Sequence, residues 1–251
     1  MNDWFDTHIH LLAPEWRQRP EELYQQISAL GVGKMVMPGV RVADWPALLA
    51  LAQHLPAVYF APGLHPVYAD QWNANAAEQL KRLAGMEKVV AIGEIGLDAV
   101  AGPSLDEQEL VFRSQLQIAL DCNLPVLLHS RNTTGRVLAV LRELNVGQQV
   151  GGIWHGFSGS IQVANELVCL GFKIGVGPIL LRKSARKLPL AVVNLPEDAL
   201  VLETDAPDMI AEVDGLLHVA QRLAELKGWN LERVAKMTYE NATRVFSRIQ
   251  C

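Results

Sequence analysis

The chain has 251 residues, with 22 lysines and arginines against 27 aspartates and glutamates, so its formal net charge is −5. Half of the residues are hydrophobic and 20% are charged, a composition that excludes a disordered chain and a basic nucleic-acid-binding module. The length suits one α/β barrel of typically ~250 residues. A core of that size needs no metal ion or disulfide for stability, so any metal ligands are available for chemistry.

The first ten residues, MNDWFDTHIH, carry polar side chains where a signal peptide would have an apolar run. No stretch reaches the ~18 consecutive apolar residues of a membrane span. We therefore expect a cytoplasmic protein that does not contact a membrane, and we predict no protein partner.

Short aliphatic or β-branched runs alternate with longer segments of helix-like apolar spacing, and glycine or proline separates them. Strands are expected at residues 4–8, 34–37, 57–61, 89–93, 125–129, 152–155, 173–176 and 199–203. Helices are expected at 21–30, 42–53, 74–83, 105–121, 134–144, 160–170, 212–226 and 231–248. Asn230 is the expected N-cap of the last helix. Pro189 interrupts the apolar run 188–193, so a helix there has to begin near the proline.

Strands that are almost continuously apolar and alternate with helices predict a parallel sheet covered on both faces. Eight such units in this length favour a closed (β/α)8 barrel of the TIM type, somewhat distorted, over an open doubly wound sheet. No composition break or linker divides the chain, so residues 1–251 are expected to form a single domain.

Residues that bind metal ions recur where the expected strands end. In a barrel, the carboxyl ends of the strands carry the active site. Two histidines follow the first strand, and because they lie two residues apart on an extended chain, their side chains point to the same side. Together these residues supply enough nitrogen and oxygen ligands for two divalent ions that share a carboxylate. The candidate metal ligands are His8, His10, Glu94, His129, His155 and Asp205.

Taken singly, each of these signals has a simpler explanation. A lone histidine after an apolar run is more often a buried, hydrogen-bonded residue than a ligand, and only the joint pattern favours a metal site. Other catalytic arrangements are missing. The segment from Gly156 to Gly159 lacks the spacing of a nucleophile elbow, and Gly175 and Gly177 are not followed by the third glycine of a dinucleotide fingerprint.

Three further residues are candidates for substrate binding. His65, in the loop after the third strand, is either a substrate contact or a structural turn residue. Arg131 and Ser158, after the fifth and sixth strands, are expected to bind oxygen atoms of the substrate, the arginine through charge-assisted hydrogen bonds. The alternative for Arg131 is an ordinary surface cation. If Glu94 is the carboxylate that the two ions share, Asp205 is the better candidate to orient a water molecule and take its proton.

Seven segments in chain order carry a family resemblance. The succession FDTHIH, GLHP, GEIGLD, PVLLHSR, HGFSGS, LVLETDAP and ENATRVF resembles the TatD family of metal-dependent hydrolases over nearly the whole chain. The resemblance implies a distorted TIM barrel of the amidohydrolase superfamily with two divalent cations, Zn, Mn or Mg. It also implies that His8, His10 and Asp205 hold one cation, His129 and His155 hold the other, and Glu94 bridges them.

The resemblance further implies phosphodiester hydrolysis, as in family members that are deoxyribonucleases. The chain departs from the family after Asp205, where a long loop rich in arginine and asparagine is usual. Here the 205–215 segment is short and contains Asp208, Glu212 and Asp214. We therefore expect short single-stranded DNA or a small phosphoester as substrate. The alternative is a hydrolase of another small phosphoester, an amide or a lactone, and a non-enzymatic barrel is disfavoured because no ligand is missing.

Overall fold

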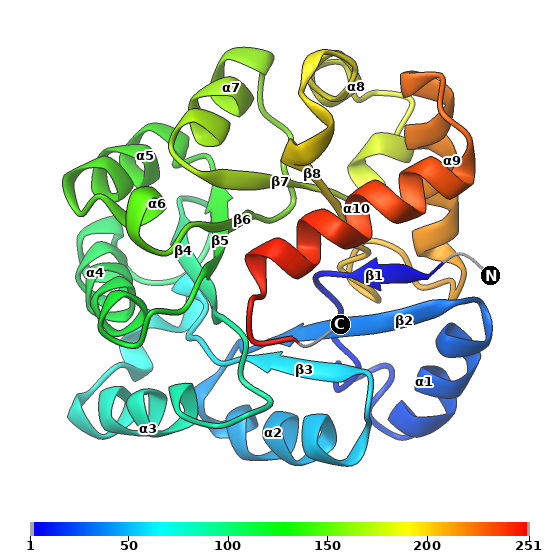
Figure 1. Cartoon of the computed structure of the whole chain (residues 1–251). Helices are drawn as coiled ribbons and strands as arrows, with labels where there is room; N and C mark the ends of the chain where they lie inside the picture. The colour runs from blue at the N-terminus through cyan, green and yellow to red at the C-terminus, as the bar shows by residue number, and fades with distance from the viewer. Residues whose placement is uncertain (1–2, 250–251) are drawn as a thin grey trace. The chain divides into compact units, whose positions relative to one another are not determined.

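The structure is a computed structural model that describes residues 3–249 (Figure 1). Within these residues, strands and helices alternate along the chain. The strands are β1 (Trp4–Asp6), β2 (Val32–Pro38), β3 (Val58–Ala61), β4 (Ile92–Asp98), β5 (Val126–Arg131), β6 (Gly152–Trp154), β7 (Phe172–Val176) and β8 (Leu200–Leu202). Except for β4, each lies where a strand was expected, with small shifts at the ends.

Helices connect these strands. They are α1 (Pro20–Ala29), α2 (Trp45–His54), α3 (Ala74–Ala84), α4 (Leu105–Asp121), α5 (Thr134–Glu143), α6 (Val146–Gln149), α7 (Ile161–Cys169), α8 (Lys187–Asn194), α9 (Gly215–Lys227) and α10 (Leu231–Val245). Short 3-10 helices are η1 (Val42–Asp44), η2 (Pro66–Gln71), η3 (Pro178–Leu181) and η4 (Glu197–Ala199).

The described chain divides into two compact units, each assembled from separate stretches of sequence. The first unit comprises residues 3–37, 155–169 and 173–244, and the second comprises residues 38–154, 170–172 and 245–249. The single domain expected over residues 1–251 stays a prediction.

In the first unit, β1 pairs with β2 and β7 pairs with β8, both in parallel. The end of β1 is joined to the end of β8, because the Thr7 N–H donates to the Leu202 carbonyl at 3.0 Å. Helix α10 packs on these strands, with the Phe5 and Tyr239 rings 5.8 Å apart. The carboxyl ends of β1 and β8 therefore lie side by side.

In the second unit, β4, β5 and β6 form consecutive parallel pairs. All seven residues of β4 are buried, as expected for a parallel strand covered on both faces. Gly96 faces His129 across the β4–β5 pair, and a Cβ atom at Gly96 would overlap the His129 carbonyl oxygen. The glycine therefore permits the close approach that brings the two strands together at this end.

The predicted range of the fourth strand, residues 89–93, is wrong, because β4 runs from Ile92 to Asp98. The apolar run begins at Val89, but that residue makes only an isolated bridge to Phe60. Strand pairing continues through the glycines and the two carboxylates of residues 92–98. A prediction from hydrophobicity alone ends the strand at such residues. As a result, Glu94 lies inside the strand and Asp98 lies at its carboxyl end.

The helices follow the sequence expectations closely. Helix α4 has the predicted bounds, and the Asn230 side chain accepts a hydrogen bond from the Arg233 N–H at 2.8 Å, which confirms it as the cap of α10. The last helix ends at Val245 rather than at residue 248. Helix α8 contains Pro189 as its third residue, a position in the first turn where the missing N–H costs no helical hydrogen bond.

Among residues 3–249, no helix combines the length and the apolar character that a membrane crossing requires.

Candidate metal centre

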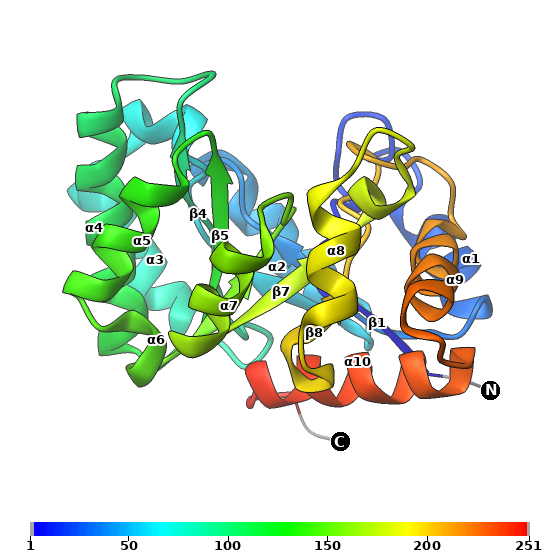
Figure 2. The same cartoon turned by 90° about the horizontal axis from the view of Figure 1, so that it is seen from above.

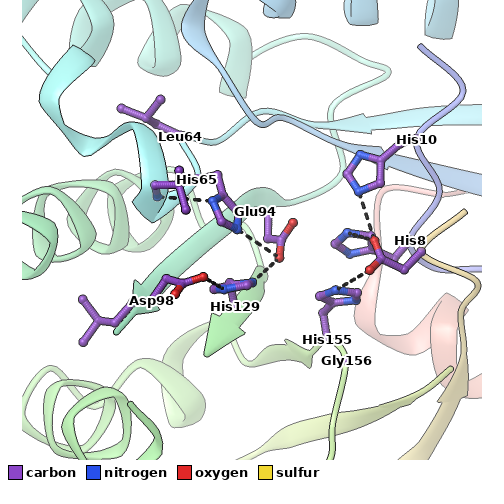
Figure 3. A network of polar contacts seen from close by, with 12 residues as sticks. His8, His10, Leu64, His65, Glu94, Asp98, His129, His155 and Gly156 are labelled. Carbon is purple, nitrogen blue, oxygen red and sulfur yellow. Dashed lines mark hydrogen bonds and ion pairs between the residues drawn. The ribbon is translucent and has the colours of Figure 1, made fainter. Parts of the chain in front are cut away.

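The first unit brings three histidines and one aspartate together at the carboxyl ends of its strands (Figure 3). We call His8, His10, His155 and Asp205 the His8 cluster. His8 and His10 follow β1, His155 follows β6 and Asp205 follows β8. The Asp205 N–H donates to the His8 carbonyl, and the His10 N–H donates to the Ala206 carbonyl, both at 2.8 Å. This pairing of the backbones aligns the side chains.

The three imidazoles turn their Nε2 atoms toward one carboxylate. The Nε2 atom of His10 lies 3.1 Å from Asp205 Oδ1, and the Nε2 atom of His8 lies 3.6 Å from the same oxygen. The His155 Nε2 lies 3.5 Å from Asp205 Oδ2. The His8 and His155 rings are stacked, with centroids 3.6 Å apart. Imidazole nitrogens and a carboxylate oxygen are ligands of Zn and Mn, so the donor set fits a divalent cation.

Asp205 has an unusual backbone conformation and is held as an anion. Its φ of +52° lies in the left-handed region, which residues with a Cβ atom seldom adopt, although aspartate and asparagine do so more often than most. Burial raises the pKa of its carboxyl group, but the charge of His155 and the contact with His10 outweigh burial, so the pKa lies below its ordinary value. The group is therefore ionised at neutral pH.

Glu203 lies behind His155, on the side away from Asp205. Its Oε1 atom is 3.2 Å from the His155 Nδ1 and accepts a hydrogen bond from the Gly156 N–H at 2.7 Å. A carboxylate beside Nδ1 favours a proton there, which directs the lone pair of Nε2 toward Asp205. The Glu203 side chain is 1% exposed, and it packs over Gly175 and Gly177 of the β7 end, where a Cβ atom at Gly175 would overlap it.

Asp6 joins the ends of β1 and β8 next to the cluster through hydrogen bonds. Its Oδ2 accepts a hydrogen bond from the Thr204 hydroxyl at 2.6 Å, and its Oδ1 accepts from the N–H groups of Thr204 and His8 at 3.1 and 3.2 Å. Burial raises the pKa of Asp6 to about 7, although these hydrogen bonds oppose the rise. Asp6 therefore fixes the backbone from which His8 projects.

The second unit contains a second group of ligand-type residues. We call Glu94, Asp98, His129 and His65 the Glu94 cluster (Figure 3). Glu94 and Asp98 project from β4, His129 from β5 and His65 from the loop after β3. The His129 Nδ1 lies 2.8 Å from Glu94 Oε1, and the His129 Nε2 lies 3.1 Å from Asp98 Oδ2.

This geometry places one carboxylate against each nitrogen of the His129 ring. A neutral imidazole has one N–H group and can donate to only one of two carboxylates. Asp98 also accepts hydrogen bonds from the Val100 and Ala101 N–H groups at 2.7 and 3.1 Å. Burial raises the pKa of Asp98, but its hydrogen bond with His129 and those backbone bonds outweigh burial and lower it to about 2. With its proton on the Asp98 side, His129 turns the Nδ1 lone pair toward Glu94, an arrangement that fits a divalent cation.

His65 has a different role in the Glu94 cluster. Its Nδ1 accepts a hydrogen bond from the Val67 N–H at 3.3 Å, so Nε2 carries the proton. That Nε2 lies 3.9 Å from Glu94 Oε1. His65 is therefore a hydrogen-bond donor facing Glu94 rather than a metal ligand, which is compatible with the predicted substrate contact.

Two buried glutamines on α4 hold the backbone of the second unit in place. The Gln115 side chain accepts from the Leu64 N–H at 2.7 Å and donates to the Leu64 carbonyl at 3.1 Å. The Gln108 side chain bonds the Asp98 N–H and carbonyl in the same way, at 2.8 and 2.9 Å. One helix face thus fixes the residue before His65 and the residue that orients His129.

The two other predicted substrate contacts stay predictions. Arg131 is the last residue of β5 and is exposed, and Ser158 is exposed in the connection between β6 and α7. Both therefore lie after carboxyl ends of strands. The resemblance grouped His155 with His129, whereas the described contacts of His155 are with His8, Asp205 and Glu203.

Sequence reasoning assigned no role to several residues that orient the ligands. Glu203 and Asp98 stand in the same strand-end segments as Asp205 and Glu94, so their position was a usable signal. The two glutamines lie seven residues apart on the inner face of a predicted helix, where an amide among apolar residues indicates a specific hydrogen bond. Asp6 precedes His8 by two residues, and its partner Thr204 is 198 residues away.

Comparison with known proteins shows to which family the chain belongs. A model of the family described as TatD related DNase matches residues 5–247. The uncharacterized metal-dependent hydrolase YabD of Bacillus subtilis is 36% identical, over 96% of this chain and 98% of its own. The 3'-5' ssDNA/RNA exonuclease TatD of Pectobacterium parmentieri is 31% identical, over 96% of this chain and 98% of its own.

A solved structure also matches. The crystal structure of YjjV, a TatD homologue from Escherichia coli K12, has a TM-score of 0.91 and 34% identity, and the match covers 97% of this chain and 98% of that one. The predicted fold class, an α/β barrel of the TIM type, is confirmed by this similarity.

Proposed function

Because the chain belongs to the TatD family of metal-dependent hydrolases, we propose that it cleaves phosphodiester bonds in DNA or short single-stranded oligonucleotides. The observation that carries the proposal is the direction of three imidazole Nε2 atoms toward one ionised carboxylate, Asp205. The choice of substrate is supported by the relative from Pectobacterium parmentieri, which is called a 3'-5' ssDNA/RNA exonuclease.

The ligand sets proposed for two cations follow from the two clusters. The His8 cluster offers three imidazoles and the Asp205 carboxylate to one cation. Glu94 and the Nδ1 atom of His129 are offered to the other, and the family resemblance implies that Glu94 bridges. When bound, such cations polarise a phosphoryl oxygen and lower the pKa of a water molecule toward 7. Zn, Mn and Mg are the candidate ions.

Asp205 is the proposed acceptor of the proton from the attacking water. It is ionised at neutral pH and held by contacts with His8, His10 and His155. Glu203 and Asp6 keep this end of β8 in place, so the carboxylate needs no rearrangement before it acts.

Three residues are proposed to bind the substrate phosphate. His65 presents its Nε2 proton, since its Nδ1 is occupied by the Val67 N–H. Arg131 contributes a guanidinium group that matches two phosphate oxygens, and Ser158 contributes a hydroxyl group. Of the three groups, only Arg131 carries a positive charge that offsets the charge of the substrate, and the acidic 205–215 segment disfavours an extended polyanion.

The test uses the purified protein with defined Zn, Mn or Mg and four substrates, which are a short single strand of DNA, bis(p-nitrophenyl) phosphate, a lactone and an amide. We expect hydrolysis of the first two, loss of activity with a chelator and recovery with a divalent ion. The Asp205→Asn variant should lose at least a hundredfold in kcat. His218→Gln, on the exposed face of α9, is the matched control. Hydrolysis of the lactone or amide alone would overturn the phosphodiesterase proposal.

A further inference from the structure

The connection between η3 and α8 in the first unit is strongly basic. Residues 182–187 read Arg-Lys-Ser-Ala-Arg-Lys, and all four basic side chains are exposed. From residue 174 to residue 196 the sequence contains no aspartate or glutamate. The segment therefore concentrates positive charge in a chain whose net charge is −5.

These four cations differ from most others in the structure. Arg113 and Arg136 bind carboxylates on neighbouring helices, and Lys227 donates to backbone carbonyls. Among residues 3–249, none of Arg182, Lys183, Arg186 and Lys187 forms an ion pair with a carboxylate. Their charges are thus available to a ligand, whereas most arginine charges elsewhere are already neutralised.

The basic segment lies at the functional end of the first unit. Strands β7 and β8 are parallel, with Val176 beside Leu202, so the chain leaves both strands at the same edge. Asp205 follows β8 by three residues, and the basic segment begins six residues after β7. Helix η3 packs against α9, the helix that follows the 205–214 connection. Figure 2 shows the connections before α8 and α9 at the same end of this unit.

The basic segment is tightly folded rather than extended. The Arg182 N–H donates to the Ile179 carbonyl at 3.1 Å, and the Arg182 carbonyl accepts from the Ala185 N–H at 3.0 Å. Helix α8 then begins at Lys187. Arg182 and Lys183 lie in this turn, and Arg186 and Lys187 lie at the start of α8. The backbone that carries all four is therefore already ordered, so less conformational freedom is lost when they bind a ligand.

We propose that the 182–187 segment binds the phosphates of a single nucleic-acid strand next to the bond that is cleaved. This inference rests on the proposed function, and it adds a binding surface for the strand outside the metal ligands. Lys and Arg contacts to phosphate supply most of the sequence-independent affinity of nucleic-acid-binding proteins. Because charges are screened over ~8 Å at physiological salt, this local cluster matters more to a bound strand than the net charge.

The proposal changes the expected response to salt. Without a basic loop after Asp205, the sequence favours one or two phosphate contacts and a shallow salt dependence. Four additional contacts on a single strand would add ~0.7 each to the log–log slope of affinity against salt, or ~3 in total. Strands long enough to reach the basic segment should therefore bind more tightly than a dinucleotide.

An anionic membrane surface is the competing partner. Leu190 and Val193 are exposed on α8, 65% and 47%, and a basic segment beside apolar residues is also typical of membrane-binding helices. The position of the four cations, at the strand ends that carry the His8 cluster, favours the nucleic-acid strand.

The test compares two charge-matched variants in the metal-loaded protein. The segment variant carries Arg182→Gln, Lys183→Gln, Arg186→Gln and Lys187→Gln. The control variant carries Lys81→Gln, Arg82→Gln, Arg222→Gln and Lys236→Gln, residues of α3, α9 and α10 that are exposed except for the half-buried Arg222. Both lose four positive charges. A fluorescent twelve-nucleotide single strand with cleavage-resistant phosphorothioate linkages reports binding across a salt series.

We expect the segment variant to bind the strand at least tenfold more weakly at 0.1 M salt, with a salt slope lower by 2 to 3, and the control to bind like the wild type. The ratio of DNA cleavage to bis(p-nitrophenyl) phosphate cleavage should fall at least tenfold. Arg182→Lys with Arg186→Lys should keep most of the affinity. Equal affinity of both variants overturns the proposal, as does wild-type binding to phosphatidylserine vesicles but not to the strand. A wild type that binds the strand yet cleaves neither substrate overturns the proposed function and leaves the strand surface intact.

Discussion

Glu203 and His155 are partners across two chain segments, with Glu203 Oε1 3.2 Å from the His155 Nδ1 and the His155 Nε2 directed at Asp205. A carboxylate behind a metal-ligating imidazole fixes the tautomer and raises the basicity of the ligand nitrogen. Two residues of the same strand end, Glu203 and Asp205, thus contact opposite nitrogens of one ring. The relationship gives the buried Glu203 a role that its own position away from the substrate would not suggest.

The Glu203→Gln variant tests this role. The amide keeps the size of the side chain but removes its charge, so the preference for a proton on the His155 Nδ1 is lost. Changes to such partners typically cost 10–100-fold in metal affinity or activity. We expect both the metal affinity, measured by metal titration, and kcat to fall by a factor in that range. The unfolding temperature of the metal-free protein should change little. Metal affinity and kcat within twofold of the wild type would contradict the assignment.

Gly175→Ala should produce the same loss by displacing the carboxylate. A Cβ atom at this position overlaps the Glu203 side chain, which is buried and has little room to move. We expect lower metal affinity together with a destabilisation of 1–3 kcal/mol, typical of overpacking, measured by urea denaturation. Gly135→Ala is the matched control, because Gly135 lies in α5 with no neighbour within 4 Å of the added atom. That change should be neutral or stabilise the helix by up to ~1 kcal/mol. Normal metal affinity in Gly175→Ala would count against the packing argument.

Gln115→Leu should destabilise the second unit. The substitution leaves the buried Leu64 N–H and carbonyl groups without their partners, and each buried polar group left unsatisfied costs ~1–3 kcal/mol. We expect a loss of ~2–4 kcal/mol in urea denaturation and a raised KM, because the neighbouring His65 is displaced. Gln117→Leu, on the exposed side of the same helix, should change stability by less than ~0.5 kcal/mol. Similar unfolding midpoints for the two variants would show that the Leu64 contacts contribute little.

The stability of the α4–α5 surface should depend on pH through Glu109. The hydrogen bond from Arg136 is the main cause that lowers the pKa of this carboxyl group. Burial opposes it, and the hydrogen bond from Arg113 adds to the lowering, so the pKa lies below its ordinary value. A folded-state pKa below the unfolded one means that the stabilisation is fully present above the ordinary glutamate pKa and is lost as pH falls through the folded value.

Glu109→Gln should therefore be destabilising at pH 7, by ~1 kcal/mol or less for such a partly exposed pair. The difference from wild type should shrink as the pH falls from 4.5 toward 3, measured by thermal unfolding at each pH. Glu15→Gln, an exposed residue with no ion pair among residues 3–249, is the control and should show no such trend. A difference that is constant over this pH range would indicate a packing effect instead.

The order and type of the elements could be predicted from the sequence because their signals are local. Apolar periodicity predicted the bounds of α4, where the structure adds a capping box of Ser104 and Glu107, and Asn230 marked the start of α10. The strand ends then carried ligand-type residues. Parallel strands bring their carboxyl ends to the same edge, so the meeting of His8 and His10 with Asp205 was already implied by the order of the chain.

Local signals failed where pairing rather than hydrophobicity extends a strand. Strand β4 contains Glu94 inside it and Asp98 at its carboxyl end, and both carboxylates are buried although no apolar pattern in the sequence predicts their burial. For the same reason, the bounds of the fourth strand were wrong.

The sequence by itself indicated which residues are candidate ligands, because a residue's type and its place after a strand are properties of one short segment. Only the tertiary structure decided how those residues are oriented. Gly175 and Gly177 look in the sequence like an incomplete nucleotide-binding motif, yet they make space for Glu203, a residue 28 positions later. The hydrogen bonds between Gln115 and Leu64 likewise join segments that are distant in the sequence, and such contacts arise only when the chain is folded.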